Sequence, residues 1–211
     1  MEIVKINFSN PDISYIEKAV KVVRLGGVIV YPTDTVYGLG ADALRISSIE
    51  RLFKIKKRPL NKPVPVMVKD IEMAEEIAFI DDKTKMILKK IWPGPVTVVL
   101  RKRSIVPTIL TAGRENIGLR IPDCLVCEKI MEILDAPITC TSANISGESP
   151  CVCSEDVIKA FKDYPRPDLI LDAGCIKHSL PSTVLDLTGK KPKFLRIGPV
   201  NKKDLLKILG I

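Results

Sequence analysis

A basic segment over residues 56–63 contains side chains suited to holding phosphate groups. Lys56, Lys57, Arg58 and Lys62 place four cations within seven residues, and two prolines restrict the backbone around them. A helical pattern ends at this segment, and an apolar, strand-like run over 64–68 overlaps its end and continues beyond it. The cations are therefore expected on a stiff connector beside a sheet, where little conformational entropy is left to lose on binding. A solvated helix end is the alternative interpretation of such a charge run.

Two pairs of polar side chains with alternate spacing point to the same chemistry. They are Lys56-x-Arg58 and Ser142-x-Asn144. On extended backbone, residues i and i+2 share a face, so one pair would present an ammonium with a guanidinium and the other a hydroxyl with an amide. Fixed donors of this kind suit a polyphosphate or a developing oxyanion. Ser-x-Asn after a strand is also compatible with a plain turn.

Five further polar side chains lie at the ends of predicted strands or in the loops beside them. They are Thr35, Asn116, Arg120, Ser182 and Arg196. In open α/β sheets, ligands bind outside the strand ends, so these side chains are candidate ligand contacts. The alternative for each of them is a purely structural role in capping a strand.

Several common catalytic arrangements are excluded. Gly38-x-Gly40-x-x-Ala43 matches the glycine spacing of the dinucleotide fingerprint but not its context. Six residues separate it from the strand ending at Tyr31, and no second strand ending in an acidic residue follows about 20 residues later. No P-loop pattern occurs. His178 is the single histidine, which removes Cys–His and Ser–His pairs, and no carboxylate cluster marks a general acid–base dyad or a protein metal site. Catalysis would therefore work by positioning and charge stabilisation, as in phosphoryl and nucleotidyl transfer.

The cysteines allow two interpretations. They are Cys124, Cys127, Cys140, Cys151, Cys153 and Cys175. The spacings Cys124-x-x-Cys127 and Cys151-x-Cys153 are compatible with zinc, but the first pair falls on a predicted amphipathic helix and neither is set among zinc-ribbon turns. We expect free, mostly buried cysteines in a reducing compartment.

Length and composition limit the number of domains and the class of protein. The chain has 211 residues, 46% of them hydrophobic, with no linker, repeat or low-complexity tract, so we expect one domain over 1–211. No run reaches the roughly 18 apolar residues of a membrane span. Residues 1–5 do not resemble a signal peptide, which favours a cytoplasmic protein. A net charge of +8 favours polyanionic partners such as a nucleoside triphosphate or RNA.

The periodicity predicts strands that alternate with helices. Predicted strands cover 3–6, 28–31, 64–68, 96–100, 117–121, 137–141, 169–171, 182–187 and 194–197. Helices are predicted from residue 11 to about 25, from a Ser47/Glu50 capping box to 55, and over 71–78, 82–91, 123–134 and 154–161, with one at the terminus. The segments 32–40 and 142–147 are interpreted as loops. The fold class is therefore α/β, with a single open, twisted, mixed sheet of about seven strands flanked by helices.

The ordered motifs of the chain resemble the YrdC/Sua5 family. The matching segments are 26–39, 56–59, 92–97, 118–122, 142–147, 181–184 and 196–198. The resemblance implies a single YrdC-like domain with a twisted α/β sheet around a concave, positively charged cleft. It also implies a threonylcarbamoyl-AMP synthase, a nucleotidyltransferase that combines L-threonine, bicarbonate and ATP and releases pyrophosphate. Its product supplies the threonylcarbamoyl group of adenosine 37 in tRNA, through a downstream transferase.

The resemblance also assigns residues by motif. The signature cleft residues, expected to be catalytic, are Lys56, Arg58, Ser142 and Asn144. The residues expected to face ATP are Arg58, Lys62, Asn116, Ser142 and Arg196. The residues expected to hold threonine are Thr35, Arg120, Cys140 and Ser182, with the Arg120 fork on the carboxylate. Magnesium is expected on the triphosphate and not on a protein metal site.

Two departures and two alternatives accompany the resemblance. Met67 stands where some members have a histidine, and the chain ends at Ile211, where longer members continue into a linker and a second domain that covers the nucleotide. A basic module that binds tRNA or double-stranded RNA without synthase activity is the main alternative, although aromatics are only 5% and Trp92 is the single tryptophan. A carbamoyl-transfer accessory domain is disfavoured, because its acylphosphatase-like and zinc-finger partners are absent from this sequence.

Overall fold

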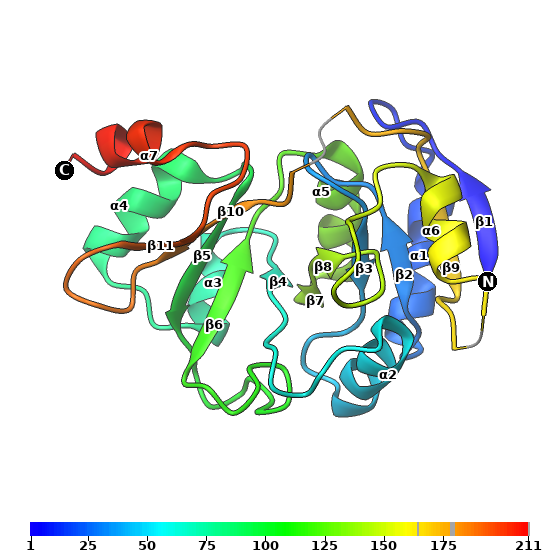
Figure 1. Cartoon of the computed structure of the whole chain (residues 1–211), viewed down its shortest axis with the longest axis horizontal. Helices are drawn as coiled ribbons and strands as arrows, with labels where there is room; N and C mark the ends of the chain where they lie inside the picture. Colours follow the sequence, from blue (N-terminus) through cyan, green and yellow to red (C-terminus); the bar gives the residue numbers. More distant parts are fainter. Residues whose placement is uncertain (164, 178–179, 211) are drawn as a thin grey trace.

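The computed structural model describes residues 1–163, 165–177 and 180–210 as two sheets side by side with helices around them (Figure 1). The strands are β1 (Glu2–Lys5), β2 (Ile29–Tyr31), β3 (Gly38–Gly40), β4 (Val66–Met67), β5 (Val96–Arg101), β6 (Asn116–Arg120), β7 (Ile138–Thr139), β8 (Thr141–Ser142), β9 (Leu169–Asp172), β10 (Thr183–Asp186) and β11 (Lys193–Arg196). The helices are α1 (Ile13–Arg24), α2 (Ile46–Lys56), α3 (Ile71–Ile77), α4 (Asp82–Ile91), α5 (Leu125–Leu134), α6 (Ser154–Ala160) and α7 (Lys202–Leu209). His178, on which the argument about a lone histidine rests, lies outside the described residues.

The mixed α/β class is confirmed, and the number of sheets is corrected. One sheet has the strand order β1-β9-β2-β3-β8 and the other β11-β10-β5-β6-β4-β7, so the described residues form two sheets of five and six strands. Four strands, β3, β4, β7 and β8, contain only two or three residues each. The predicted strands 64–68 and 137–141 contain β4, β7 and the first residue of β8, whereas β3 was not predicted. Such short strands are too short to show an alternating pattern, and the segments 32–40 and 142–147 were therefore interpreted wholly as loops.

The Gly-x-Gly segment has a packing role at the centre of the first sheet. β2 is fully buried, and β3 pairs with it in antiparallel register, with Gly38 opposite Tyr31. A Cβ added at Gly38 or Gly40 would lie 2.8 or 2.7 Å from the Tyr31 ring. These glycines therefore make room for a buried tyrosine, whose hydroxyl donates to the main-chain oxygen of Thr139 at 3.0 Å. A phosphate-binding turn is not needed to explain them.

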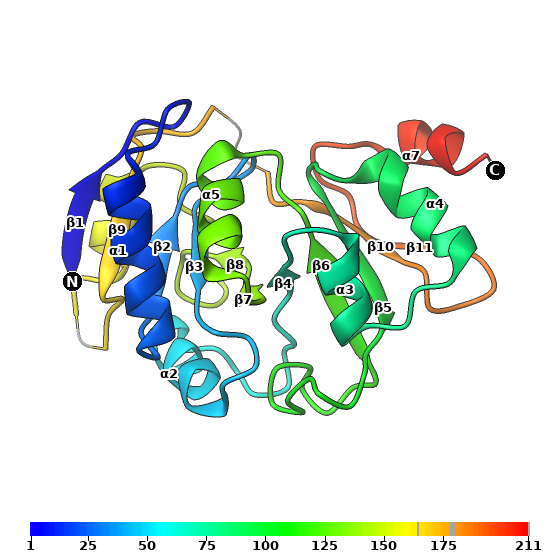
Figure 2. The same ribbon diagram turned by 180° about the vertical axis from the view of Figure 1, so that it is seen from behind.

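Helices cover both faces of the first sheet and one face of the second. α1 and α5 pack side by side on one face of the first sheet, with α6 on the opposite face; α3, α4 and α7 lie along the second sheet (Figure 2). α1 begins after Asp12, whose carboxylate accepts from the Ser14 N–H, and it buries the apolar stripe that its periodicity predicts. The Ser47/Glu50 capping box is wrong, because the N-cap of α2 is Arg45, two residues before Ser47, and its side chain makes no capping bond. No helix in the described residues has the length and apolar character needed to span a bilayer.

The chain passes from one sheet to the other within five residues. β7 pairs with β4 in the second sheet, and β8 pairs with β3 in the first. Cys140 is the residue between β7 and β8, and its N–H donates to the main-chain oxygen of Pro65 at 2.7 Å. Polar groups carried by the two sheets are therefore brought together around this crossing.

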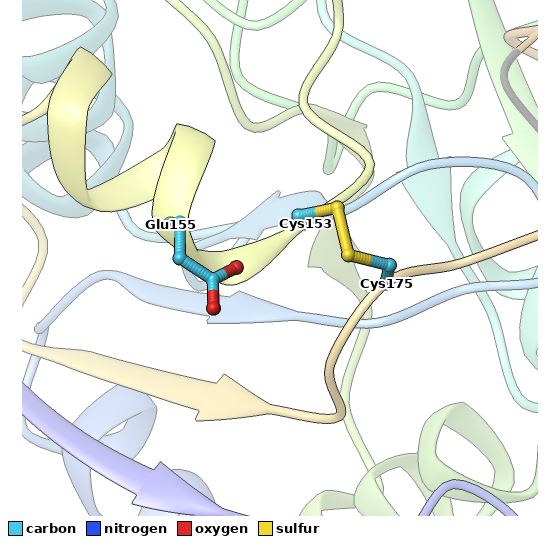
Figure 3. Close-up of side chains that lie close together, drawn as sticks. All are labelled: Cys153, Glu155 and Cys175. Carbon is cyan, nitrogen blue, oxygen red and sulfur yellow. A yellow bond between two sulfur atoms is a disulfide. The ribbon is translucent and has the colours of Figure 1, made fainter.

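The expectation of six free cysteines is wrong for one pair. Cys153 and Cys175 form a disulfide, with their Cα atoms 4.1 Å apart, while the other four cysteines are free (Figure 3). The bond joins the start of α6 to the segment after β9, where the Ile176 N–H also donates to the main-chain oxygen of Val152. These segments lie 22 residues apart in sequence, so their proximity depends on tertiary structure that spacing alone does not show.

Candidate active site where the two sheets meet

Two cavities meet at this crossing and share three lining residues, Arg58, Pro65 and Arg196. The first has a volume of about 150 Å³, and the second about 300 Å³. The first is lined by Thr33, Thr35, Val36, Tyr37, Gly38, Arg58, Pro65, Arg120, Cys140, Thr141, Ser142, Pro181, Ser182 and Arg196. The second is lined by Arg58, Pro63, Val64, Pro65, Thr97, Val99, Arg114, Asn116, Gly118, Val184, Asp186, Leu195 and Arg196. A small compartment therefore adjoins a larger one across a wall that carries two arginines.

Lys56 is directed into the protein from the last turn of α2. Its Nζ donates to the main-chain oxygens of Ser142 at 2.6 Å and Asn144 at 3.0 Å, and to Oδ1 of Asn144 at 3.0 Å. The side chain is 1% exposed. Burial, and then the charge of Arg58, lower the pKa of Lys56 to about 7, while the three oxygens that accept from Nζ favour its ammonium form. Lys56 thus holds the segment that follows β8.

Lys56 and Arg58 do not share a face of extended backbone, contrary to the expectation from their spacing. Lys56 is helical, and Lys57 adopts a left-handed conformation with φ 49°. This reversal sends Arg58 along the connector, where Nε donates to the Lys62 main-chain oxygen at 3.1 Å and Nη2 to that of Pro63 at 2.6 Å. Arg58 lines both cavities, and burial lowers its pKa. Lys56 lines neither.

Asn144 connects the groups behind Ser142. Its Oδ1 accepts from the Ser142 hydroxyl at 2.6 Å as well as from Lys56, and its Nδ2 donates to the main-chain oxygens of Ile145 at 2.8 Å and Glu148 at 2.7 Å. Every hydrogen-bonding position of the amide has a partner, and the residue is 4% exposed. The segment 142–148 is therefore fixed, with the Ser142 hydroxyl at the wall of the smaller cavity.

Arg120 is held rigidly at the end of β6. Its Nε donates to the main-chain oxygen of Gly94 at 3.0 Å, Nη1 to Oγ1 of Thr35 at 2.9 Å and Nη2 to Oδ1 of Asp34 at 2.5 Å. Arg120 is 4% exposed, and Oδ2 of Asp34 is buried without a hydrogen-bond partner among the described residues. A guanidinium has five N–H donors, so three bonds leave two for a ligand in the cavity that Arg120 lines.

Ser182 lies between a threonine and an arginine on the opposite wall. Its hydroxyl is 2.7 Å from Oγ1 of Thr97, while Nε and Nη2 of Arg196 donate to the main-chain and side-chain oxygens of Ser182 at 2.9 and 3.2 Å. Burial, and then the nearby charge of Arg120, lower the pKa of Arg196. A Cβ added at Gly198 would lie 2.2 Å from the main-chain oxygen of Pro181, so only glycine allows this close approach.

Most residues proposed from the sequence lie on these two cavities. The smaller cavity is lined by Thr35, Arg58, Arg120, Cys140, Ser142, Ser182 and Arg196, and the larger by Arg58, Asn116 and Arg196. Asn144 and Lys56 lie behind Ser142, and Lys62 is exposed on the connector. Met67 is buried and lines a different cavity.

The smaller cavity also contains a residue that the sequence argument passed over. Thr33 is 2% exposed, and its hydroxyl accepts from the N–H groups of Thr35 and Val36 and donates to the main-chain oxygen of Val36. This turn fixes the Thr35 hydroxyl beside Arg120. The hydroxyl-rich composition of 32–40 was the available signal, but it does not distinguish the two threonines.

One group of potential metal ligands occurs among the described residues, away from the two cavities. The ligand atoms of Cys153, Glu155 and Cys175 lie within 4.8 Å of one another (Figure 3). The two sulfurs are joined in a disulfide, so they cannot act as thiolate ligands in this state. The absence of a protein metal site from the candidate active site remains a prediction.

The fold and the joined cavities define an α/β protein with an arginine-rich, two-compartment site. The family model described as "Telomere recombination" (Sua5_yciO_yrdC) matches residues 21–198. The chain therefore belongs to the Sua5/YciO/YrdC family, which confirms the resemblance seen in the motifs.

Named relatives and solved structures agree with this membership. Threonylcarbamoyl-AMP synthase of Pyrococcus abyssi is 35% identical over 189 residues, which cover 89% of this chain but only 55% of that protein. The putative threonylcarbamoyl-AMP synthase of Methanocaldococcus jannaschii is 36% identical over 185 residues, 86% of each chain. The structure of P. abyssi Sua5 complexed with L-threonine matches with a TM-score of 0.94 at 33% identity, covering all of this chain and 61% of that one. Escherichia coli YciO matches with a TM-score of 0.87 at 30% identity, over 99% and 100% of the two chains.

Proposed function

We propose that this protein is a threonylcarbamoyl-AMP synthase, which converts L-threonine, bicarbonate and ATP into threonylcarbamoyl-AMP, pyrophosphate and water. The observation that carries the proposal is the pair of adjoining cavities, which share Arg58 and Arg196 at their common wall. A small polar compartment suits an amino acid, and the larger neighbour suits a nucleotide. The names of the P. abyssi and M. jannaschii relatives, and the threonine complex of P. abyssi Sua5, support the same reaction.

The smaller cavity supplies complementary groups for threonine. Two N–H donors of Arg120 have no partner among the described residues and are available for the carboxylate. Three bonds already fix its orientation, so little entropy is lost on binding. Thr35 and Ser182 contribute hydroxyls, and Cys140 contributes a less polar wall. This cavity is the proposed threonine site.

The larger cavity is the proposed ATP site. Arg58 and Arg196 at the shared wall are placed to bind phosphate oxygens, and Asn116 offers an amide on the wall of this cavity. Ser142 reaches the nucleotide from the threonine side. Lys62 lies on the exposed connector and would reach the triphosphate from outside. Magnesium would be carried on the triphosphate itself.

The chemistry follows from this placement. The threonine amine combines with bicarbonate to give a carbamate and water, and a carbamate oxygen then attacks the α-phosphorus while pyrophosphate leaves. Negative charge develops on the phosphoryl oxygens at the wall where Arg58 and Arg196 meet, and fixed cations stabilise it. Lys56 lies behind Ser142, where its ammonium form adds positive charge near the site. It also holds Ser142 and Asn144 in position.

The product is an acyl-adenylate, a form of activated threonylcarbamoyl group. We place its use in the modification of adenosine 37 of tRNA by a separate transferase, in the cytoplasm. The net charge of +8 supports contact with tRNA in this step.

The test is a product assay with labelled bicarbonate, threonine and ATP, read by mass spectrometry and pyrophosphate release. We expect labelled threonylcarbamoyl-AMP only when all three substrates are present, and at least a hundredfold loss of rate in Arg58→Ala. Lys54→Ala, an exposed lysine on α2, is the matched control and should retain the rate. Pyrophosphate release that does not require threonine would reject the proposal. Salt-sensitive tRNA binding without product, unchanged in Thr35→Ala and Ser182→Ala, would favour the RNA-binding alternative.

A further inference from the structure

The largest of the described cavities lies apart from the proposed synthase site. Its volume is about 560 Å³, and it is bounded by the ends of β4 and β6 and by the first turns of α3 and α5. Its walls include both members of the Cys124-x-x-Cys127 pair. None of the synthase roles proposed above uses these two cysteines.

The two sulfur atoms lie together at the start of α5. Cys124 is the N-cap residue and Cys127 falls in the first turn. Both thiols donate to one acceptor, the main-chain oxygen of Pro32, at 3.6 Å from Cys124 and 3.3 Å from Cys127. This shared acceptor places the two sulfurs close together, as closure of an intrachain disulfide requires.

The surroundings give the two cysteines unequal roles. Cys124 is 6% exposed and Cys127 is 1% exposed, so Cys124 is the more accessible from the cavity. Hydrogen bonds from Cys127 and from the first N–H groups of α5 lower the pKa of Cys124, whereas burial raises that of Cys127. A thiolate at Cys124 would be the attacking group, and Cys127 the resolving one.

The same surroundings disfavour a zinc site. A structural zinc ion takes four ligands, and the described residues place no third histidine, cysteine or carboxylate ligand close to both sulfurs. The remaining sulfurs on the cavity wall belong to Met67 and Met131. The pair is therefore built as a dithiol and not as half of a zinc ligand set.

We propose that Cys124 and Cys127 form a reactive dithiol, which hydrogen peroxide entering this cavity oxidises to an intrachain disulfide. The Cys124 thiolate attacks one peroxide oxygen, the O–O bond breaks, and the departing hydroxide takes up a proton to leave as water. Cys127 then attacks the sulfur of the Cys124 sulfenic acid; the S–S bond forms, the S–O bond breaks, and its oxygen leaves as a second water. Two thiols are oxidised, and one peroxide is reduced to two waters.

Oxidation has a structural consequence for the neighbouring site. The disulfide removes both S–H donors from the Pro32 oxygen. Pro32 directly precedes the turn that fixes Thr35 beside Arg120. Both thiols contact Pro32, and the next residue, Thr33, lines the smaller cavity. The oxidation itself does not depend on the synthase activity.

Peptide mapping of the folded protein tests the proposal directly. Trypsin cleaves after Arg120 and Lys129, so both cysteines fall in residues 121–129 with no other cysteine. After treatment with hydrogen peroxide and quenching, this peptide should be lighter by two hydrogen atoms, and dithiothreitol should restore its mass. We expect it to form at least tenfold faster than oxidation of Cys151, which serves as the internal reference. A peptide that keeps both thiols while Cys151 is oxidised would overturn the proposal.

Single variants separate the two roles. In Cys127→Ser, the sulfenic acid at Cys124 should persist and be trapped by dimedone, whereas in Cys124→Ser the thiol of Cys127 should remain unmodified. Cys151→Ser should oxidise over residues 121–129 like the wild type. Equal modification of Cys127 with and without Cys124 would contradict the assignment. If either variant does not fold, the wild-type peptide map decides the matter by itself.

Discussion

Nζ of Lys56 donates twice to Asn144, to its main-chain oxygen and to Oδ1, at 3.0 Å in each case. The two residues lie 88 positions apart. The contact ties the end of α2 to the segment after β8, so the connector that carries Arg58 and the end of β8 that carries Ser142 form one rigid unit. The first two predictions test this unit.

The stability of the protein should depend on the ionisation of Lys56. Its pKa is lowered to about 7 in the folded protein, mainly by burial, and is about 10.4 in an unfolded chain. Between these values the unfolded chain binds the additional proton, so the free energy of unfolding rises with pH. We expect the wild type to gain about 1.4 kcal/mol per pH unit relative to Lys56→Met between pH 7.5 and 9.5, measured by urea unfolding. Lys54→Met, at an exposed position, should run parallel to the wild type, and parallel curves for Lys56→Met would refute the effect.

Asn144→Ala should cost more stability than Ser142→Ala. The alanine leaves Lys56 with fewer acceptors and removes the donors to the oxygens of Ile145 and Glu148, so we expect a loss of about 3 kcal/mol. Ser142→Ala loses one side-chain bond at a partly exposed position and should cost about 1 kcal/mol. Chemical denaturation of both variants gives the comparison, and equal losses would mean that the amide network is not the stabilising feature.

Arg120→Lys should weaken threonine binding at least tenfold. An ammonium cannot reproduce the planar fork that contacts Gly94, Thr35 and Asp34 while leaving donors for a carboxylate. Calorimetric titration with threonine measures the change. Arg51→Lys, at a partly exposed arginine paired with Asp168, is the control and should bind as the wild type does. Unchanged affinity in Arg120→Lys would remove Arg120 from the threonine site.

Gly198→Ala should damage both stability and threonine binding. The added Cβ would come within 2.2 Å of the Pro181 oxygen and displace the segment that carries Ser182. We expect a loss of about 2 kcal/mol in urea unfolding and a fall of at least tenfold in threonine affinity. In Gly189→Ala the nearest atom lies 3.8 Å away, so this variant should keep both properties. A tolerated Gly198→Ala would show that the strand end shifts without cost.

Sequence reasoning predicted the parts of the fold that local patterns determine. The stripe of Ile16, Val20 and Val23 predicted α1, and all three are buried. Arg120 was expected near the end of a strand, and it is the last residue of β6. These features depend on side-chain periodicity and on local chain direction, which a single sequence displays.

The remaining features depend on contacts between distant segments. The separation of Arg58 from Lys56 follows from the left-handed backbone at Lys57, a position without the glycine that would indicate it. Its pairing with Asn144 and the Cys153–Cys175 bond both join segments far apart in sequence. The division into two sheets rests on strands of two or three residues, whose pairing is decided by tertiary packing and not by propensity.

The position of Cys140 between β7 and β8 limits how the molecule can move. One residue separates a strand of one sheet from a strand of the other, and consecutive Cα atoms are about 3.8 Å apart. The sheets therefore cannot slide apart at this point while both pairings persist. We therefore expect any widening of the two cavities to displace the smaller one least, because Cys140 lies on its wall.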